Sequence, residues 1–172
     1  LACKRQLKDW VGLAELVEGA LAGNYGSREG DPYEHMMEAA SALEKMHVTG
    51  DGDARSRAIH FAQGAFAAAP SRPEAVELLR RLYEKKERRT LMKVLGRHAQ
   101  NIDDKGQALL LYREAGQIAL DSEDEKAIEM SFVAVLEIAP DDFEAVKALE
   151  VAATVKGDWP AVAAWIEKQL VL

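Results

Sequence analysis

The sequence predicts an all-α fold, a solenoid built from stacked antiparallel helix pairs. The segment PSRPEAVELL at residues 70–79 recurs 70 residues later as PDDFEAVKAL. A weaker copy lies halfway, because Val76, Leu111 and Val146 follow one another at steps of 35 residues. A period of roughly 20–50 residues is typical of stacked repeats, in which each unit packs on its neighbours. No stretch of useful length alternates apolar and polar residues as a half-buried strand would.

The composition also favours closely packed helices. Of the 172 residues, 48% are hydrophobic but only 6% are aromatic, and alanine and leucine supply most of the apolar content. These two residues are strong helix formers. The five prolines and most glycines fall between the periodic segments, where they separate elements instead of interrupting them.

Nine helices are predicted, at about residues 8–21, 32–47, 54–69, 72–83, 88–101, 105–120, 123–139, 142–157 and from 159 onward. Most follow a side chain that can accept a hydrogen bond from the first-turn amides, and each such cap stabilises a helix by about 1 kcal/mol. The expected caps are Asp9, Asp31, Asp53, Ser71 with Glu74, Ser122 with Glu125, Asp141 with Glu144, and Asp158. Pro32 and Pro160 stand in first turns, where the missing amide hydrogen has no intrahelical acceptor.

Residues 58–70 combine small residues, an aromatic and a closing proline, and Val76, Leu79 and Tyr83 follow them. This stretch resembles the second helix of a tetratricopeptide repeat and the first helix of the next one. Residues 127–140 repeat the pattern, and the turns at residues 8–10 and 157–159 are similar to the turn inside such a repeat. The resemblance implies one right-handed superhelical array over residues 1–172. It would consist of a half repeat at 1–23 and helical pairs at 31–70, 71–103, 104–140 and 141–172.

The repeats depart from the family pattern where the two helices of a pair should touch most closely. That position holds Ala40, Arg80, Ala115 and Glu150, of which two are small. Pairs with a large residue there are expected to splay or to pack in a shifted register. By the same resemblance, Trp10 and Trp159 occupy equivalent places and are expected to pack between helix pairs.

The charge distribution argues against nucleic acid as the main partner. The formal net charge is −7 and the pI about 5.2, whereas binding to a phosphate backbone depends on clustered cations. One basic cluster is present, formed by Arg80, Arg81, Lys85, Lys86, Arg88, Arg89 and Lys93. Two interpretations remain open, a solvated helix corner or a docking patch for an acidic partner.

No catalytic or metal-binding pattern is found, and we expect no enzyme activity, cofactor or metal. The four histidines lie on different helices, and none of their spacings places two on one helical turn. The acidic groups open helices, where negative charge is favoured. Cys3 is the single cysteine, and neither a signal peptide nor a membrane span is recognisable, so a cytoplasmic location is expected.

The resemblance implies a binding scaffold whose first helices line a concave groove. The groove residues would be Glu34, Met37, Ser41, Glu44, Glu77, Arg81, Glu84, Leu109, Tyr112, Gly116, Leu120, Lys147, Val151 and Thr154. The nine expected to carry partner binding are Met37, Ser41, Glu77, Arg81, Leu109, Tyr112, Gly116, Lys147 and Val151. Such a groove, acidic at one end and apolar in the middle, suits a peptide or helical segment with hydrophobic anchors and some basic residues.

Tyr112 is the expected centre of binding, because three leucines precede it and it shares a helix face with Leu109 and Gly116. Packing of Tyr112 on an adjacent helix pair is the alternative. Two other functions stay open for the chain as a whole. It could be a regulatory or accessory helical-repeat part of a larger enzyme, or an RNA-binding helical repeat. The oligomeric state is also open.

Overall fold

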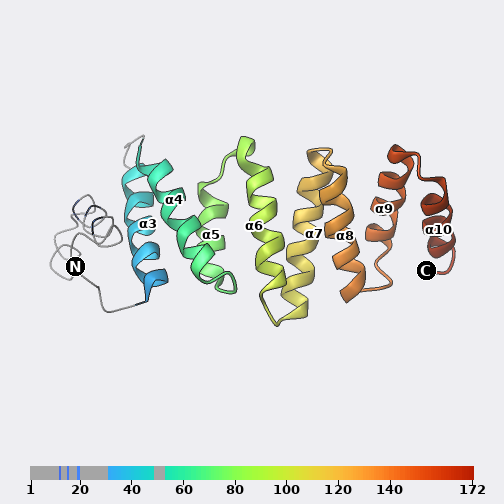
Figure 1. Ribbon diagram of the computed structural model, residues 1–172, viewed down its shortest axis with the longest axis horizontal. Coiled ribbons are helices and arrows are strands. Elements are labelled where there is room, and N and C mark those ends of the chain that lie inside the picture. Colours follow the sequence, from blue (N-terminus) through green and yellow to red (C-terminus); the bar gives the residue numbers. More distant parts are fainter. Residues whose placement is uncertain (1–11, 13–14, 16–18, 20–30, 49–52) are drawn as a thin grey trace. The chain divides into compact units, whose positions relative to one another are not determined.

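The computed structural model describes residues 12, 15, 19, 31–48 and 53–172, and within them it contains eight α-helices and no strand. The all-α class is therefore confirmed for these residues. The helix predicted at residues 8–21, with Asp9, Trp10 and the half repeat at 1–23, lies outside the described residues except at three helical positions. The element labels are those of Figure 1.

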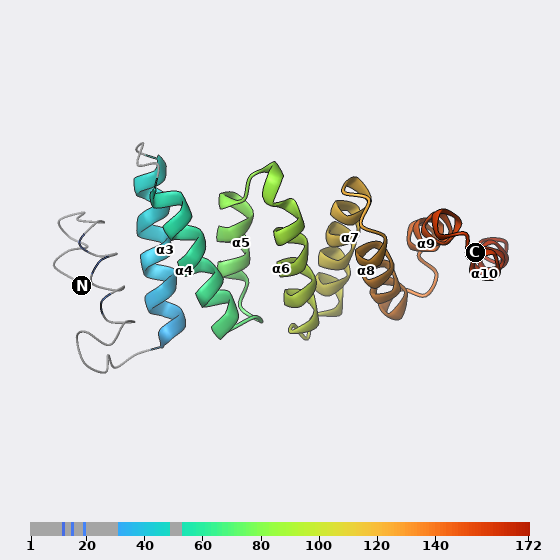
Figure 2. The same cartoon turned by 45° about the horizontal axis from the view of Figure 1, so that its top comes forward.

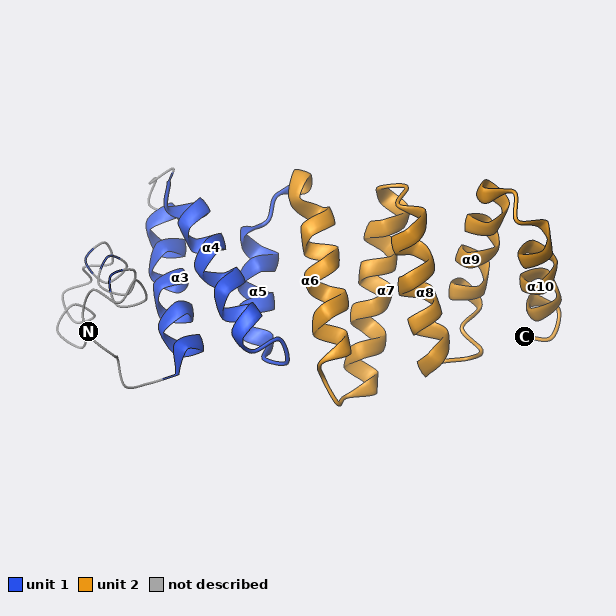
Figure 3. Ribbon diagram, in the orientation of Figure 1, with its two compact units in different colours: residues 1–84 blue, residues 85–172 orange. Residues whose placement is uncertain are grey.

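The chain divides into two compact units, residues 1–84 and residues 85–172 (Figure 3). In the first unit α3 (Pro32–Val48), α4 (Ala54–Ala68) and α5 (Pro73–Leu82) follow one another, and α4 packs on both of its neighbours. The second unit begins with a 3₁₀ turn, η1 (Lys85–Glu87). Its α-helices are α6 (Arg88–Gln100), α7 (Lys105–Asp121), α8 (Glu125–Ile138), α9 (Phe143–Lys156) and α10 (Trp159–Gln169).

Within the second unit each helix packs on the helices before and after it in the chain. Figures 1 and 2 show these helices side by side in chain order. The boundary between the units falls between α5 and α6, inside the predicted pair 71–103. The single array over residues 1–172 stays a prediction.

Alanine fills much of the interface between α3 and α4. Ala39 and Ala40 of α3, and Ala58, Ala62 and Ala65 of α4, are all completely buried. Because their side chains are single methyl groups, the two helix backbones approach closely and pack tightly.

The 70-residue repeat is visible in the burial of the first helices. Four core positions of α5 are matched 70 residues later in α9, namely Ala75, Val76, Leu78 and Leu79 by Ala145, Val146, Ala148 and Leu149. The intermediate copy differs. The N-cap residues are Arg72, Asp104 and Asp142, so α7 begins 32 residues after α5 and 38 before α9.

Counted from these caps, Leu111 stands at the register of Leu79 and Leu149, not of Val76 and Val146. The copy spaced by 35 residues is therefore displaced by three residues in the helix. Leu111 is half-buried, and Ala108 takes the buried place that Val76 has in α5.

Helix boundaries agree with the sequence within about two residues, but several caps were predicted wrongly. Arg72 precedes α5 and no side chain of residue 71 or 72 caps it. Asp124, not Ser122, caps α8 by accepting a hydrogen bond from the Ala127 amide at 3.1 Å. The Ser122 hydroxyl instead donates to the Ile118 carbonyl at the end of α7 (2.7 Å).

The cap of α9 is also one residue later than predicted, because Asp142 and not Asp141 accepts from the Ala145 amide (2.9 Å). Asp53 precedes α4 without a side-chain cap hydrogen bond. Two predicted caps are confirmed. Asp31 accepts from the Tyr33 amide (2.9 Å), and Asp158 accepts from the Ala161 amide (3.2 Å).

Trp159 does not pack between helix pairs as predicted, because 67% of it is exposed. It is the first residue of α10, and the half-buried aromatic of that helix is Trp165. Trp165 lies over a small cavity of about 70 Å³ together with Val133 of α8 and Leu149 of α9. The helix rotation that buries Val162 and turns Trp165 inward leaves Trp159 in solvent.

Candidate protein-binding grooves

Four of the predicted site residues lie on neighbouring helices of the first unit. Met37 and Ser41 are half-buried on α3, and Glu77 and Arg81 are exposed on α5. Arg81 binds the carboxylate of Glu44 with both Nε (2.8 Å) and a terminal nitrogen (3.1 Å). This hydrogen bond raises the pKa of the Arg81 guanidinium. Two of the residues expected to meet a partner charge are thus already paired with each other.

A second polar cluster joins the start of α3 to the start of α5. The guanidinium of Arg72 lies 3.7 Å from the centre of the Tyr33 ring and donates to Asp31 (3.2 Å) and Glu34 (2.6 Å). The Tyr33 hydroxyl donates to Glu74 at 2.9 Å, while the ring is buried. Burial, together with this hydrogen bond, raises the pKa of Tyr33 to about 12.

These pairs change the expected ligand chemistry. Glu34 and Glu44 were to form the acidic end of the groove, but arginines of the same unit neutralise both. Glu77 likewise accepts from Arg80 at 2.7 Å. These carboxylates were the reason to expect basic residues in the ligand. Because they are neutralised, that expectation no longer holds at this face.

In the second unit, the first helices α7 and α9 enclose a groove of about 560 Å³. Its lining includes Lys147 and Val151 of the predicted site and Leu120 of the wider groove set. The full lining is Arg113, Gln117, Leu120, Phe132, Asp142, Glu144, Lys147, Ala148 and Val151. Phe132 comes from the second helix α8 and closes the floor. The groove thus has an apolar floor and a polar border.

The border of the α7/α9 groove is electrically balanced. Arg113 forms an ion pair with Asp142, and its Nε donates to the same carboxylate at 3.0 Å. Burial opposes ionisation of Asp142, but the Ala145 amide and the Arg113 guanidinium together lower the pKa of that carboxyl. Lys147 and Glu144 add one further charge of each sign. The groove therefore offers apolar contact and polar edges without a preference for one charge.

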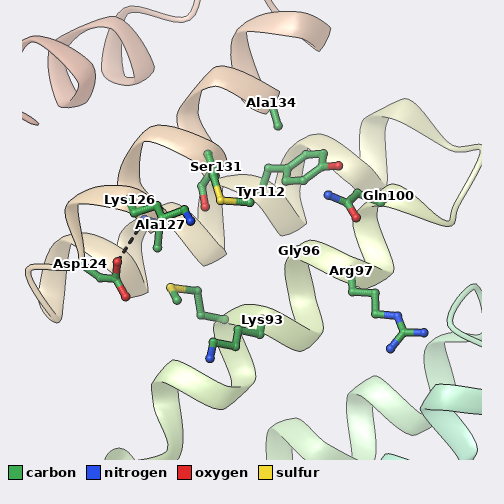
Figure 4. Close-up of a pocket in the computed structure, with 12 residues that line it drawn as sticks. Lys93, Gly96, Arg97, Gln100, Tyr112, Asp124, Lys126, Ala127, Ser131 and Ala134 are labelled. Atoms are coloured by element: carbon green, nitrogen blue, oxygen red, sulfur yellow. Dashed lines mark hydrogen bonds between the residues drawn. The ribbon is translucent and has the colours of Figure 1, made fainter.

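The structure separates Tyr112 from Lys147 and Val151. Tyr112 lies in a different pocket, of about 580 Å³, between the second helices α6 and α8 (Figure 4). The lining from α6 is Met92, Lys93, Gly96, Arg97 and Gln100, and that from the α8 segment is Asp124, Lys126, Ala127, Met130, Ser131 and Ala134. Burial, and secondly the negative charge of Glu137, raise the pKa of Tyr112.

Leu109 and Gly116 line neither pocket. Leu109 is half-buried, and Gly116 is buried against the ring of Phe132. The space expected beside Gly116 for a ligand is occupied by that ring. Of the three leucines that precede Tyr112, Leu110 is the exposed one, with 64% of its surface accessible.

The α6/α8 pocket was missed by sequence reasoning, although one signal pointed to it. Gly96 stands in a helix interior, where glycine costs about 1 kcal/mol relative to alanine. A Cβ atom at this position would meet no atom within 4 Å, so the glycine leaves open space beside it in the pocket.

Arginines of the predicted basic cluster are engaged within the protein. Arg88 pairs with Asp121 (3.3 Å), and Arg89 donates to the Ser122 carbonyl (2.9 Å), which ties the start of α6 to the end of α7. Lys93 instead extends to the α6/α8 pocket.

Among the residues that the structure describes, no three His, Cys, Asp or Glu side chains lie close enough to hold a metal ion. None of the described helices combines the length and the apolar character needed to cross a membrane.

The sequence matches no protein-family model and no curated protein. Solved structures of similar fold include the following three. A crystal structure of MamA is 18% identical, with a TM-score of 0.46, and the match covers 97% of this chain and 90% of MamA. A second MamA crystal structure is 15% identical (TM-score 0.47, 98% and 85% covered), and a MamA mutant is 17% identical (TM-score 0.47, 95% and 97% covered). Because these scores are low, we infer function from the residues of this chain.

Proposed function

We propose that this chain is a non-enzymatic scaffold that binds a peptide or helical segment of a partner protein in the α7/α9 groove. The observation that carries the proposal is the groove itself, which has an apolar floor and is bordered by charged groups of both signs. Val151 on its wall is 48% exposed. Concave apolar surfaces with a few polar groups are the usual sites for peptide segments.

The resemblance to tetratricopeptide repeats supports the same groove. In that family the first helices of successive pairs face the ligand, and α7 and α9 are the first helices of the predicted pairs 104–140 and 141–172. Lys147 and Val151, two of the residues expected to bind, lie side by side in the groove lining with Gln117 and Leu120. An apolar ligand side chain would meet Leu120 and Val151, and backbone groups of the ligand could bond Gln117 and Lys147.

The proposal is tested by site-specific cross-linking. A photo-reactive phenylalanine analogue replaces Gln117, which is exposed in the groove, and in a matched control it replaces Ala163, which is exposed on α10. We expect a partner that cross-links from position 117 and not from position 163. The cross-linked segment is then synthesised, and its Kd is measured with the wild-type chain and with Val151→Asp.

A charge placed on the apolar wall should weaken binding of that segment by about tenfold or more, because it must be desolvated against an apolar ligand. Unchanged affinity for Val151→Asp, or equal cross-linking from both positions, contradicts the proposal. A cross-linked nucleic acid would favour the RNA-binding alternative instead.

A further inference from the structure

The α6/α8 pocket combines an apolar interior with a border that is positive in an otherwise acidic chain. Met130, which is 60% exposed, and Tyr112 supply apolar surface, and Met92 lies almost fully buried in the wall. The small residues Gly96 and Ala127 leave room between the two helices. The border carries three cations, Lys93, Arg97 and Lys126, against the single carboxylate of Asp124. The chain as a whole has a net charge of −7.

The arrangement of these charges leaves two of the cations open to a ligand. Lys93 and Lys126 are exposed on opposite walls and form no ion pair with any residue that the structure describes (Figure 4). The carboxylate of Asp124 is already used, because it accepts the hydrogen bond of the Ala127 amide at the start of α8. The pocket thus presents a net positive edge.

Tyr112 lies at the other end of the pocket, toward Gln100 and Arg97 (Figure 4). Figure 4 shows the Tyr112 ring between Ala134 of α8 and Gln100 of α6. The Tyr112 hydroxyl forms no hydrogen bond with any described residue. Glu137 is close enough to influence this tyrosine, so an acidic group of a ligand is disfavoured beside the Tyr112 ring and favoured near the lysines.

We propose that the α6/α8 pocket is a second docking site, which takes an acidic segment of a partner protein that carries large apolar side chains. The apolar anchors would fill the space beside Gly96 against Met92, Met130 and Tyr112. The carboxylates would pair with Lys93 and Lys126. Methionine suits this role, because its flexible and polarisable side chain adapts to different apolar surfaces. The proposal does not depend on what the α7/α9 groove binds.

The methionines also provide the measurement. The chain has five, and only Met92 and Met130 line this pocket, whereas Met36, Met37 and Met46 belong to α3. Their ¹³C-labelled methyl groups are followed by NMR while a synthetic helical peptide of about 16 residues with leucines on one face and glutamates on the other is added. We expect the signals of Met92 and Met130 to shift and those of the α3 methionines to stay in place.

Two control peptides separate the two contributions. One has the glutamates replaced by lysines, and the other has the leucines replaced by serines. Both should bind about tenfold or more weakly than the acidic amphipathic peptide. Binding should also weaken when the ionic strength rises from about 0.05 to about 0.3 M, because the exposed lysines are screened by salt.

Three variants test the residues. Lys93→Glu with Lys126→Glu should reduce affinity about tenfold or more, whereas Lys105→Glu, an exposed lysine outside the pocket, should leave it unchanged. Gly96→Leu should fill the pocket and abolish the Met92 and Met130 shifts. The thermal unfolding curve checks that this variant is folded, which we expect because a Cβ atom at residue 96 meets no atom within 4 Å.

Several results would overturn the proposal. They are equal binding of the lysine peptide, undiminished binding by Gly96→Leu, and shifts confined to the α3 methionines. A short single-stranded RNA that shifts Met92 and Met130 at lower concentration than the acidic peptide would assign the positive border to nucleic acid instead.

Discussion

The ring of Phe132 in α8 fills the space that a side chain on Gly116 of α7 would need. A Cβ atom at residue 116 would lie 2.8 Å from Cζ and 2.9 Å from Cε2 of that ring. Contacts this short do not occur between real side chains, so the glycine is what allows the two helices to pack. Phe132 also forms the floor of the α7/α9 groove, which makes the groove dependent on a glycine that a ligand need not touch.

Substituting alanine for the two helix-interior glycines of the second unit should therefore have opposite effects on stability. Gly116→Ala should lower the free energy of unfolding by about 1–3 kcal/mol, because the new methyl overpacks against Phe132. Gly96→Ala should raise it by about 0.5–1 kcal/mol, since alanine favours the helix and the methyl has open space. Urea denaturation of the two variants checks both signs. A stable Gly116→Ala would show that Phe132 moves aside at little cost.

The two tryptophans of α10 should also differ. Trp159→Ala should change the free energy of unfolding by no more than about 0.5 kcal/mol, because the side chain is largely in solvent. Trp165→Ala should cost about 1–2 kcal/mol, less than for a fully buried tryptophan, since Trp165 is half-buried against α8 and α9. Thermal unfolding of the two variants gives the comparison. If Trp159→Ala proves the more destabilising, the rotation of α10 described here is wrong.

Asp142 and Asp141 form a matched pair for testing the cap of α9. Asp142→Ala should cost about 1–2 kcal/mol at neutral pH, because it removes the hydrogen bond to the Ala145 amide and the partner of Arg113. Asp141→Ala, which removes an exposed carboxylate that caps nothing, should be close to neutral.

The same pair gives a pH dependence. The pKa of Asp142 is lowered in the folded chain, so its contribution is complete above the unfolded pKa of about 4 and is lost as the pH falls further. The difference between wild type and Asp142→Ala should therefore shrink below about pH 4. A difference that is constant from neutral to acidic pH would show that the carboxylate charge contributes nothing.

The raised pKa of Tyr33 predicts a change in stability at alkaline pH. Its pKa of about 12 in the folded chain exceeds the unfolded value of about 10, so its contribution is complete below about pH 10 and is lost as the pH rises toward 12. Tyr33→Phe should cost about 1 kcal/mol at pH 8 through loss of the hydrogen bond to Glu74. Near pH 12 the phenylalanine variant should become the more stable of the two. Parallel loss of stability in both proteins would show that ionisation of other groups dominates.

The sequence predicted eight helices of the described residues within about two positions because prolines, glycines and aspartates mark their ends. It could not choose between Ser122 and Asp124, or between Asp141 and Asp142, since either member of each pair can accept a hydrogen bond from a first-turn amide. That choice depends on the path of the chain between helices, which local residue preferences do not determine.

The residues that line the two pockets were harder to predict than the helices, because the lining depends on how each helix is rotated. Lys147, Val151 and Leu120 line one groove together, whereas Tyr112, which was assigned to the same face, lies in the other pocket. The three-residue displacement of the α7 register accounts for part of this error. The space beside Gly116 was predicted to be open for a different reason. Phe132, which fills it, lies on another helix, and the local sequence does not show that the two residues meet.

Helix α10 has a single buried residue, Val162, and packs mainly on α9, with Trp165 also reaching toward α8. In a row of helices where each interface contributes separately, a helix with few buried residues can open without the others. Opening α10 requires only the free energy of that interface and leaves the packing of α6, α7 and α8 intact. The second unit can therefore expose the outer face of α9 to solvent far more often than it unfolds, while the two proposed sites stay formed.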